Sequence, residues 1–288
     1  GPFWDANEVW LITAGGAMFA AFPHWYATMF SGFYIPLVFM LLALILRGVA
    51  FEFRGKLEQP GWRNTWDWAI WSGSFLPPLL WGVVLANFMT GMPITEDMEL
   101  GGNFLQYLHP FALLGGVMFV LLTMTHGLQF ITLRTKDELQ ERARKLNRKV
   151  TPISIIALLL FAVIGYYISD VFTYLGQGFI IIPIIAWLAL FVSYFLNKQG
   201  RDKLAFTLTS ISIASLTASI FIGMFPRVMI SSIDDAFSLT VYTASSGDYT
   251  LKLMTITAVI LLPIVLAYTA WSYYIFRKRL STDDDLEY

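Results

Sequence analysis

The sequence predicts an all-α polytopic membrane protein with eight transmembrane helices. Of its 288 residues, 57% are hydrophobic and only 14% are charged, which is more apolar surface than one water-soluble domain of this size can bury. Apolar stretches of about the 20 residues needed to cross a bilayer recur along the chain. They lie near residues 7–23, 25–50, 64–90, 104–133, 151–170, 179–197, 204–225 and 252–276. No connection between them has room for a soluble domain, so residues 1–288 are interpreted as one integral membrane domain.

The basic residues predict the orientation of these spans. Cytoplasmic loops are enriched in Lys and Arg, and 17 of the 19 basic residues fall on one side when the chain crosses eight times. They follow the second, fourth, sixth and eighth spans, and only Arg227 and Lys252 fall on the other side. Both ends of the chain are therefore predicted to face the cytoplasm, and shifting the count by one span would break the pattern.

Local patterns support the individual elements in turn. The first span, 7–23, carries small residues at helical spacing that let a neighbouring helix approach closely. Trp25 opens the second span and several tryptophans open the third, as aromatic belts do at a membrane interface. Pro77-Pro78 predicts a kink in the third span. Between the fourth and fifth spans, Thr135 and Glu138 form a capping-box pattern, and opposite charges four residues apart follow it. A short cytoplasmic surface helix is therefore expected there.

The sequence offers few ligands for a redox cofactor. Cysteine is absent, which excludes disulfides, thiolate-held iron–sulfur clusters and the covalent attachment of c-type haem. The three histidines, His24, His109 and His126, do not recur at i,i+3 or i,i+4, and no Met is placed as an obvious partner ligand. We interpret them as structural or interfacial residues, and we expect no cofactor and no metal to be bound by this chain.

Acidic residues near the membrane are costly unless paired or hydrated, so they are candidates for function. Asp5 and Glu8 lie at the cytoplasmic start of the first span. One interpretation makes Asp5 a helix N-cap with Glu8 as its N3 partner. The other makes them carboxylates that pass protons inward from the cytoplasm. Spacing alone favours the cap, and the two roles are compatible.

Further charged residues cluster at the inner ends of the second and third spans. Asp67 follows Arg63 by four residues, which predicts an ion pair within one helix. Arg47, Glu52 and Arg54 would form either a network of ion pairs or an entry site for protons or a quinone head group. A structural role is favoured for both groups.

Motifs spread over most spans resemble subunit II of the cytochrome bd quinol oxidases. Residues 3–17 read FWDANEVWLITAGGA, and further segments keep the order of that family along essentially the whole chain. These segments are residues 19–23, 30–34, 47–56, 62–68, 73–78, 134–135, 224–229 and 244–246. The overall pattern is similar to the members of the family with shorter loops.

The resemblance implies a subunit of a terminal oxidase that oxidises quinol and reduces dioxygen to water. It implies subunit I as the partner, carrying haem b, haem d and the quinol site, with a small accessory subunit as a further partner. The lipid bilayer and quinol would be the other contacts, and nucleic acid would not. Subunit II would bear no haem, would stabilise the complex and would be inactive alone. The expected location is the bacterial or archaeal cell membrane.

The resemblance also implies two helix bundles and an additional helix. Residues 1–134 would form the first bundle, which is incomplete because the first helix of the family is missing from the sequence. Residues 150–277 would form the second bundle and the additional helix. In the family, the acid of the Trp-Asp-x-Asn motif is implicated in a proton path from the cytoplasm. This favours proton uptake by Asp5, with Glu8 as a candidate on the same path. Trp4 and Trp10 are candidates for lining the subunit or haem interface.

Two other functions are weighed against this one. A secondary transporter would need charges near the middle of the bilayer and broken helices in both halves, whereas the charges here cluster at the ends of spans. A structural scaffold without a proton path is also compatible with the sequence. Which quinone is used, whether a quinone or a lipid binds this subunit, and whether the oxidase is of the ordinary or the cyanide-insensitive kind are left open.

Overall fold

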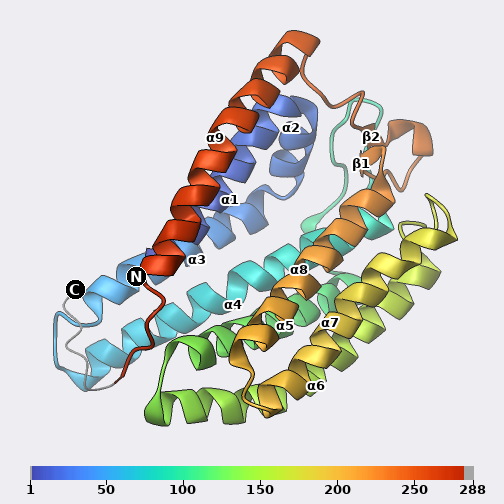
Figure 1. Ribbon diagram of the computed structural model, residues 1–288. Helices are drawn as coiled ribbons and strands as arrows, with labels where there is room; N and C mark the ends of the chain where they lie inside the picture. The colour runs from blue at the N-terminus through green and yellow to red at the C-terminus, as the bar shows by residue number, and fades with distance from the viewer. Residues whose placement is uncertain (1, 282–288) are drawn as a thin grey trace.

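The computed structural model describes residues 2–281, and the side chains of residues 2–5 and 177 lie outside the described part. This part of the chain is mostly helical, with one short antiparallel sheet (Figure 1). Its α-helices are α1 (Pro2–Ala21), α2 (Pro23–Gly32), α3 (Tyr34–Phe53), α4 (Pro60–Thr90), α5 (Pro110–Arg134), α6 (Asp137–Ile168), α7 (Ile181–Lys198), α8 (Asp202–Met224) and α9 (Asp248–Ile275). The 3-10 turns are η1 (Phe104–Leu108), η2 (Gln177–Ile180) and η3 (Asp235–Phe237), and the strands are β1 (Arg227–Met229) and β2 (Leu239–Thr240). The predicted all-α class is confirmed.

Seven helices of the described part, α3 to α9, are long and apolar enough to cross a membrane. This confirms a polytopic membrane protein. The first predicted span forms α1, a 20-residue helix whose opening turns carry Asp5, Asn7 and Glu8, and α1 is not among the seven. The count of eight spans therefore stays a prediction.

The stretch 25–50, which was predicted to be one helix, is broken at Phe33. This residue has φ −98° and ψ 23°, which ends α2 and precedes α3. Its ring is only 1% exposed and lies 5.1 Å from the ring of Tyr107. Beside it, Gly32 lies so close to Leu100 that a Cβ at this position would clash. Packing against the outer loop therefore interrupts a continuous apolar pattern, which is a tertiary effect that overrides local propensity.

The predicted surface helix and the fifth predicted span are one continuous helix, α6, of 32 residues. Its two exposed i,i+4 pairs, Glu138 with Arg142 and Glu141 with Lys145, are present at 3.9 Å. The predicted capping box is wrong: the N-cap is Lys136, without a side-chain cap, and Thr135 donates instead to the carbonyl of Ile131. The Thr135 hydroxyl thus hydrogen-bonds to the last turn of α5 and does not cap the start of α6.

The helices from α5 to α8 pack in a ring in which each contacts the next and α8 returns to α5. Helix α4 joins this ring through α5, and α3 packs on α4. The α4–α5 contact is close because it is built on glycine: a Cβ on Gly82 would collide with the backbone of Gly115 and Gly116. Such small residues are how membrane helices come together, since lipid gives no hydrophobic drive between them. The proposed division into bundles at 1–134 and 150–277 stays a prediction.

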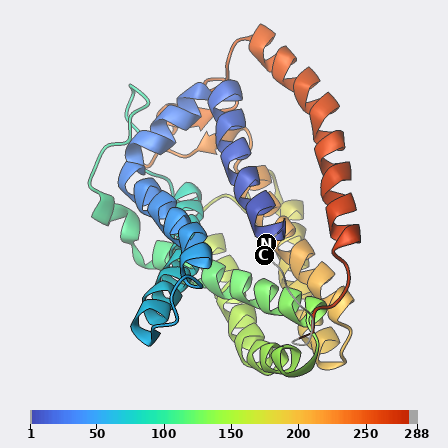
Figure 2. The same cartoon turned by 90° about the vertical axis from the view of Figure 1, so that its left-hand side faces the viewer.

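Helix α9 lies to one side of the ring, next to α1 (Figures 1 and 2). None of its side chains is buried within the described part of the chain. Its outer end is tied to α1 by Ser246, whose N–H donates to the carbonyl of Ala21 at 2.9 Å and whose hydroxyl donates to Ala20 at 2.6 Å. The faces of α1 and α9 are therefore available to lipid or to another chain.

The outer ends of the helices are covered by the connections α4–α5 and α8–α9. Strands β1 and β2 pair in the second of these connections. The first connection is hydrogen-bonded to the second. The N–H of Met92 donates to the carbonyl of Ile230 at 2.9 Å, and the N–H of Ser232 donates to the carbonyl of Met92 at 2.8 Å. This cap leaves the inner ends of α1, α3 and α4 as the place where the charged candidates gather.

Candidate functional site

An ion pair joins the first turns of α1 to the last turns of α3. The guanidinium of Arg47 donates from Nη2 to Oε1 of Glu8. Both side chains are 23% exposed, and within the described residues the Nε of Arg47 is buried without a hydrogen-bond partner. Because α1 and α3 are joined through α2 and run in opposite directions, the start of α1 meets the end of α3. The structure thus brings together two residues 39 positions apart in sequence.

The stem of Arg47 is fixed by a close helix contact. A Cβ placed on Gly73 of α4 would collide with the Cβ of Arg47 and the carbonyl of Ala43. The backbone of α4 therefore lies directly against α3 at this level, and Arg47 extends from that contact to α1. Its guanidinium is charged at any physiological pH, so Glu8 faces a permanent positive charge.

Asp5 and Trp4 lie on the backbone of α1, but their side chains are outside the described residues. Their predicted roles stay predictions. The N-cap interpretation of Asp5 is wrong, because α1 is already helical from Pro2 and an N-cap must lie outside the helix. Asp5 and Glu8 are three residues apart in this helix, which places them on one face. Trp10 is half-buried on the same helix.

A second ion pair links α3 to α4 at the same inner end. Arg54 donates to Asp67 from Nε at 2.6 Å and from Nη2 at 3.2 Å. The prediction that Asp67 pairs with Arg63 is therefore wrong. The short α3–α4 turn brings the guanidinium of Arg54 to the Asp67 carboxylate, where it forms a bidentate contact between the two helices. The hydrogen bond and charge of Asp67 raise the pKa of Arg54 above its usual value. Glu52 forms no ion pair with any described residue.

The histidines occupy separate places in the described structure. His24 is exposed at the start of α2. Nδ1 of His126 lies 2.9 Å from the Thr209 hydroxyl, in a buried polar chain that continues to Gln129 on α5. His109 is the N-cap of α5, where its Nδ1 accepts from the N–H of Ala112 at 3.3 Å. No group of three potential metal ligands exists among the described residues.

The cap role of His109 gives the fold a pH dependence. Burial lowers the pKa of His109, so the unfolded chain binds more protons than the folded one below about pH 6.5. The stabilising contribution is therefore complete above that pH and is lost as the pH falls toward the lowered pKa of the folded state. We expect the thermal midpoint of the wild-type protein to fall more steeply between pH 6.5 and 5 than that of His109→Asn, which keeps a capping oxygen without titrating. Parallel pH curves for the two proteins would contradict this.

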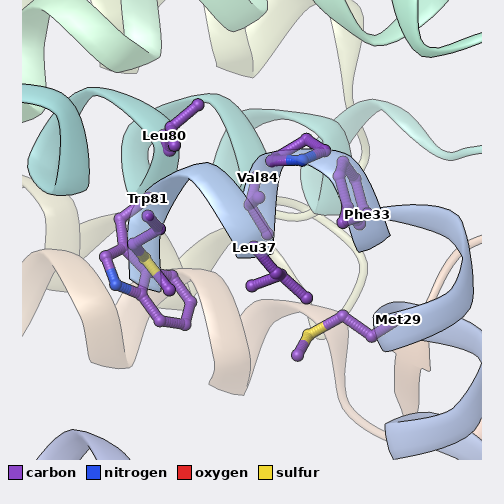
Figure 3. A pocket seen from close by; sticks show the side chains of 8 residues that line it. Met29, Phe33, Leu37, Leu80, Trp81 and Val84 are labelled. Atoms are coloured by element: carbon purple, nitrogen blue, oxygen red, sulfur yellow. The ribbon is translucent and has the colours of Figure 1, made fainter. Parts of the chain in front are cut away.

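The apolar hollows among the described residues include two that differ in size and position. One lies between α2, α3 and α4 and has a volume of only about 10 Å³ (Figure 3). Met29, Phe33 and Trp81 are among its lining residues. It is the size of a single water molecule. The other is an open groove of about 270 Å³ between the outer halves of α6 and α7, lined by residues such as Tyr166 and Trp187. Neither Glu8 nor Arg47 is among the residues that line these hollows.

Comparison with known families decides what these features belong to. The model of the family described as cytochrome bd terminal oxidase subunit II matches residues 1–276. The chain belongs to this family. It is 47% identical to cytochrome bd ubiquinol oxidase subunit 2 of Bacillus subtilis (strain 168) over 288 residues, covering 100% of this chain and 85% of that protein. It is 36% identical to cytochrome bd-I ubiquinol oxidase subunit 2 of Escherichia coli (strain K12) over 316 residues, covering 98% of this chain and 83% of that protein. It is also 36% identical to a probable cytochrome oxidase subunit 2 of Haemophilus influenzae over 314 residues.

The resemblance read from the motifs is thereby confirmed. As a cytochrome bd oxidase subunit II, the chain is part of a respiratory quinol oxidase complex and lies in the bacterial cell membrane as a multi-pass protein. The relatives named here are bacterial, and nothing in the comparisons supports the archaeal alternative. The complex of this family contains haem.

The histidines of this subunit II do not fit a resident haem. Axial ligation needs a ring nitrogen aimed at the iron, whereas both ring nitrogens of His109 are engaged, Nδ1 by the N–H of Ala112 and Nε2 by the Thr90 hydroxyl 3.3 Å away, and His126 lies between the Thr209 hydroxyl and the ring of Phe206. The remaining histidine, His24, is exposed at the start of α2, at the other end of the helices from Glu8 and Arg47. No step of the chemistry is therefore assigned to a haem on this chain.

One charged cluster of the subunit was missed in the sequence. Asp202, whose side chain is 2% exposed, accepts from Nη2 of Arg144 at 2.9 Å and from Nη2 of Arg279 at 3.1 Å. These residues come from α8, α6 and the segment after α9, so no local spacing connects them. A hint existed only in the position of Asp202 at the start of α8, where an acid is favoured by the helix dipole.

Proposed function

We propose that this chain is the subunit of the oxidase that bears no haem, stabilises the haem-bearing subunit I and takes up protons from the cytoplasm through Asp5, with Glu8 as the next group on the path. The observation that carries the proposal is the Glu8–Arg47 ion pair at the inner end of α1. Ionisable groups at membrane depth are rare because they are costly unless paired or hydrated, so a charged pair between two apolar helices is a candidate for function.

The orientation supports uptake from the inside. The basic residues cluster at the same ends of the helices as Glu8, as expected for the cytoplasmic face. Reduction of dioxygen consumes protons, and drawing them from the inner side moves charge across the membrane. Each charge moved is worth about 2.3 kcal/mol per 100 mV. An acid at the inner mouth of α1 is thus on the side where a proton path conserves energy.

The proposed partner surface is the face formed by α1 and α9. Helix α9 is apolar along its length and buries no side chain within the described residues, and Trp10 on α1 is only partly buried. We place subunit I, with haem b, haem d and the quinol site, against this face, with Trp4 and Trp10 at the interface. Lipid would cover the remaining helices, and a small accessory subunit would be a further partner. Without subunit I, this subunit II would be inactive.

The test of the proposed function is Asp5→Asn in the complete complex with subunit I, reconstituted in liposomes. We expect quinol-driven oxygen consumption and the accompanying charge movement to fall about 100-fold, because a positioned proton-transfer group contributes roughly 10² to 10⁴ in rate. Haem content, measured from the absorption spectrum, should not change. Asp67→Asn is the matched control, since Asp67 is an exposed acid at the same inner face.

Two results would decide against the proposal. Unchanged turnover and charge movement in Asp5→Asn would remove Asp5 from the mechanism and leave a scaffold. Loss of haem in Asp5→Asn but not in Asp67→Asn would make Asp5 a residue of assembly and not of proton uptake.

A further inference from the structure

Arg47 is the basic residue that the fold brings to the acid-bearing end of α1. We propose that Arg47 is a positioning residue for proton uptake, which holds Glu8 in place and balances its charge. This inference rests on the proposed function and assigns a role to a residue of α3 that does not itself carry a proton.

The contact between α4 and α3 makes this position rigid. Gly73 allows the α4 backbone to lie against the Cβ of Arg47, so the side chain leaves the helix in a defined direction. Its guanidinium reaches Glu8, and its buried Nε has no hydrogen-bond partner within the described residues. A lysine could carry the charge but not the planar fork of an arginine. Both the charge and its placement are therefore supplied by one side chain.

The electrostatic consequence follows from the spacing of the two acids. Asp5 and Glu8 are three positions apart on α1, and Arg47 places a positive charge directly against Glu8. One fixed positive charge beside Glu8 balances one of the two negative charges. Arg47 thereby keeps the Glu8 carboxylate in a fixed position on the proposed path.

Other charged and titratable groups lie on the elements that pack around this pair. Those near the inner end are Glu52 on α3 and its neighbour Arg54, Arg63 and Asp67 on α4, and Tyr268, Tyr273 and Tyr274 on α9; those near the outer end are His24 and Tyr26 on α2, Tyr34 on α3, and Asp248, Tyr249 and Lys252 on α9. Arg54 and Asp67 are already paired with each other. Among the ion pairs of the described residues, the Glu8–Arg47 pair is the one that involves α1.

The experiment compares Arg47→Gln, Glu8→Gln and the double variant in the complete complex, with Arg54→Gln as the matched control. Arg54 lies on the same inner end, but its partner is on α4 and not on α1. The measurements are haem content, turnover as a function of pH, and protons taken up from inside per dioxygen. The conservative variant Arg47→Lys keeps the positive charge but lacks the planar guanidinium, so it tests the two contributions separately.

We expect Arg47→Gln to keep its haem and to change the pH dependence of turnover, because the variant removes the positive charge that faces Glu8. Turnover at neutral pH should fall up to about tenfold, because Glu8 is no longer held in place; this is less than the roughly 10² to 10⁴ that a positioned proton-transfer group contributes, since Glu8 itself remains. The pH profile of turnover in the double variant should resemble that of Glu8→Gln. The profile of Arg47→Lys should lie between those of wild type and Arg47→Gln, and the profile of Arg54→Gln should match that of wild type.

Three outcomes would overturn the inference. They are a wild-type pH profile in Arg47→Gln, a loss of haem as its only effect, or an equal effect of Arg47→Gln with and without Glu8→Gln. If Asp5→Asn leaves turnover and charge movement unchanged, the proposed function fails. If Asp5→Asn is impaired and Arg47→Gln shows a wild-type pH profile, the inference about Arg47 fails alone.

Discussion

Replacing Asp202 with alanine is expected to destabilise the subunit by about 3 kcal/mol. The carboxylate is 2% exposed and is shared by Arg144 and Arg279, so its removal leaves two guanidinium groups without their common partner. Breaking a buried ion pair from one side typically costs about 3 to 5 kcal/mol. The lower end applies here, because Arg144 is 28% and Arg279 is 40% exposed, and water can solvate them in part.

The effect should be visible both in stability and in the segment that follows α9. Arg279 also donates from Nε to the carbonyl of Leu133, and Leu280 bridges the turn between α5 and α6. We expect a fall of several degrees in the thermal midpoint of the purified complex and faster proteolysis near Leu280. The control is Glu138→Gln, whose partner Arg142 lies 3.9 Å away on an exposed surface and should matter by less than about 0.5 kcal/mol. Equal midpoints for the two variants would contradict the role of Asp202.

Gly82→Val is expected to prevent α4 and α5 from packing. A Cβ at this position would meet the carbonyl and carbonyl carbon of Gly115 and the Cα of Gly116, and these are backbone atoms that no rotamer change can move. Overpacking of a core typically costs about 1 to 3 kcal/mol, and the cost here should be at or above the upper end because the helices themselves must separate. We expect little assembled complex in the membrane, measured as haem absorbance per unit of membrane protein.

Gly127→Ala provides the contrast within α5. Nothing lies within 4 Å of a Cβ at Gly127, and alanine is favoured over glycine in a helix interior by about 0.5 to 1 kcal/mol. The variant should assemble as well as wild type or better. If both glycine variants assembled normally, the close α4–α5 contact would not be needed for the fold.

The inner charged site shows how far sequence reasoning reaches. The motif and the distribution of basic residues indicated Asp5 and Glu8 as inner-face acids, and the charges of Arg47 and Arg54 were recognised. Their partners were not, because Glu8 with Arg47 and Arg54 with Asp67 each join two different helices. The one pair predicted there from helical spacing, Arg63 with Asp67, does not form, because Asp67 pairs with Arg54 at the end of α3. Local spacing shows which residues can meet on one helix, but not which helix lies opposite.

The sequence by itself determined the membrane class, the predicted orientation and the family, because apolar length, loop charge and motif order are properties of the chain read in one dimension. The tertiary structure alone decided the break at Phe33, the continuity of α6, the glycine contact of α4 with α5 and the partners of Arg47 and Asp202. Each of these depends on atoms brought together from distant positions, where sterics and the cost of unpaired charge select one arrangement among several that the local sequence permits.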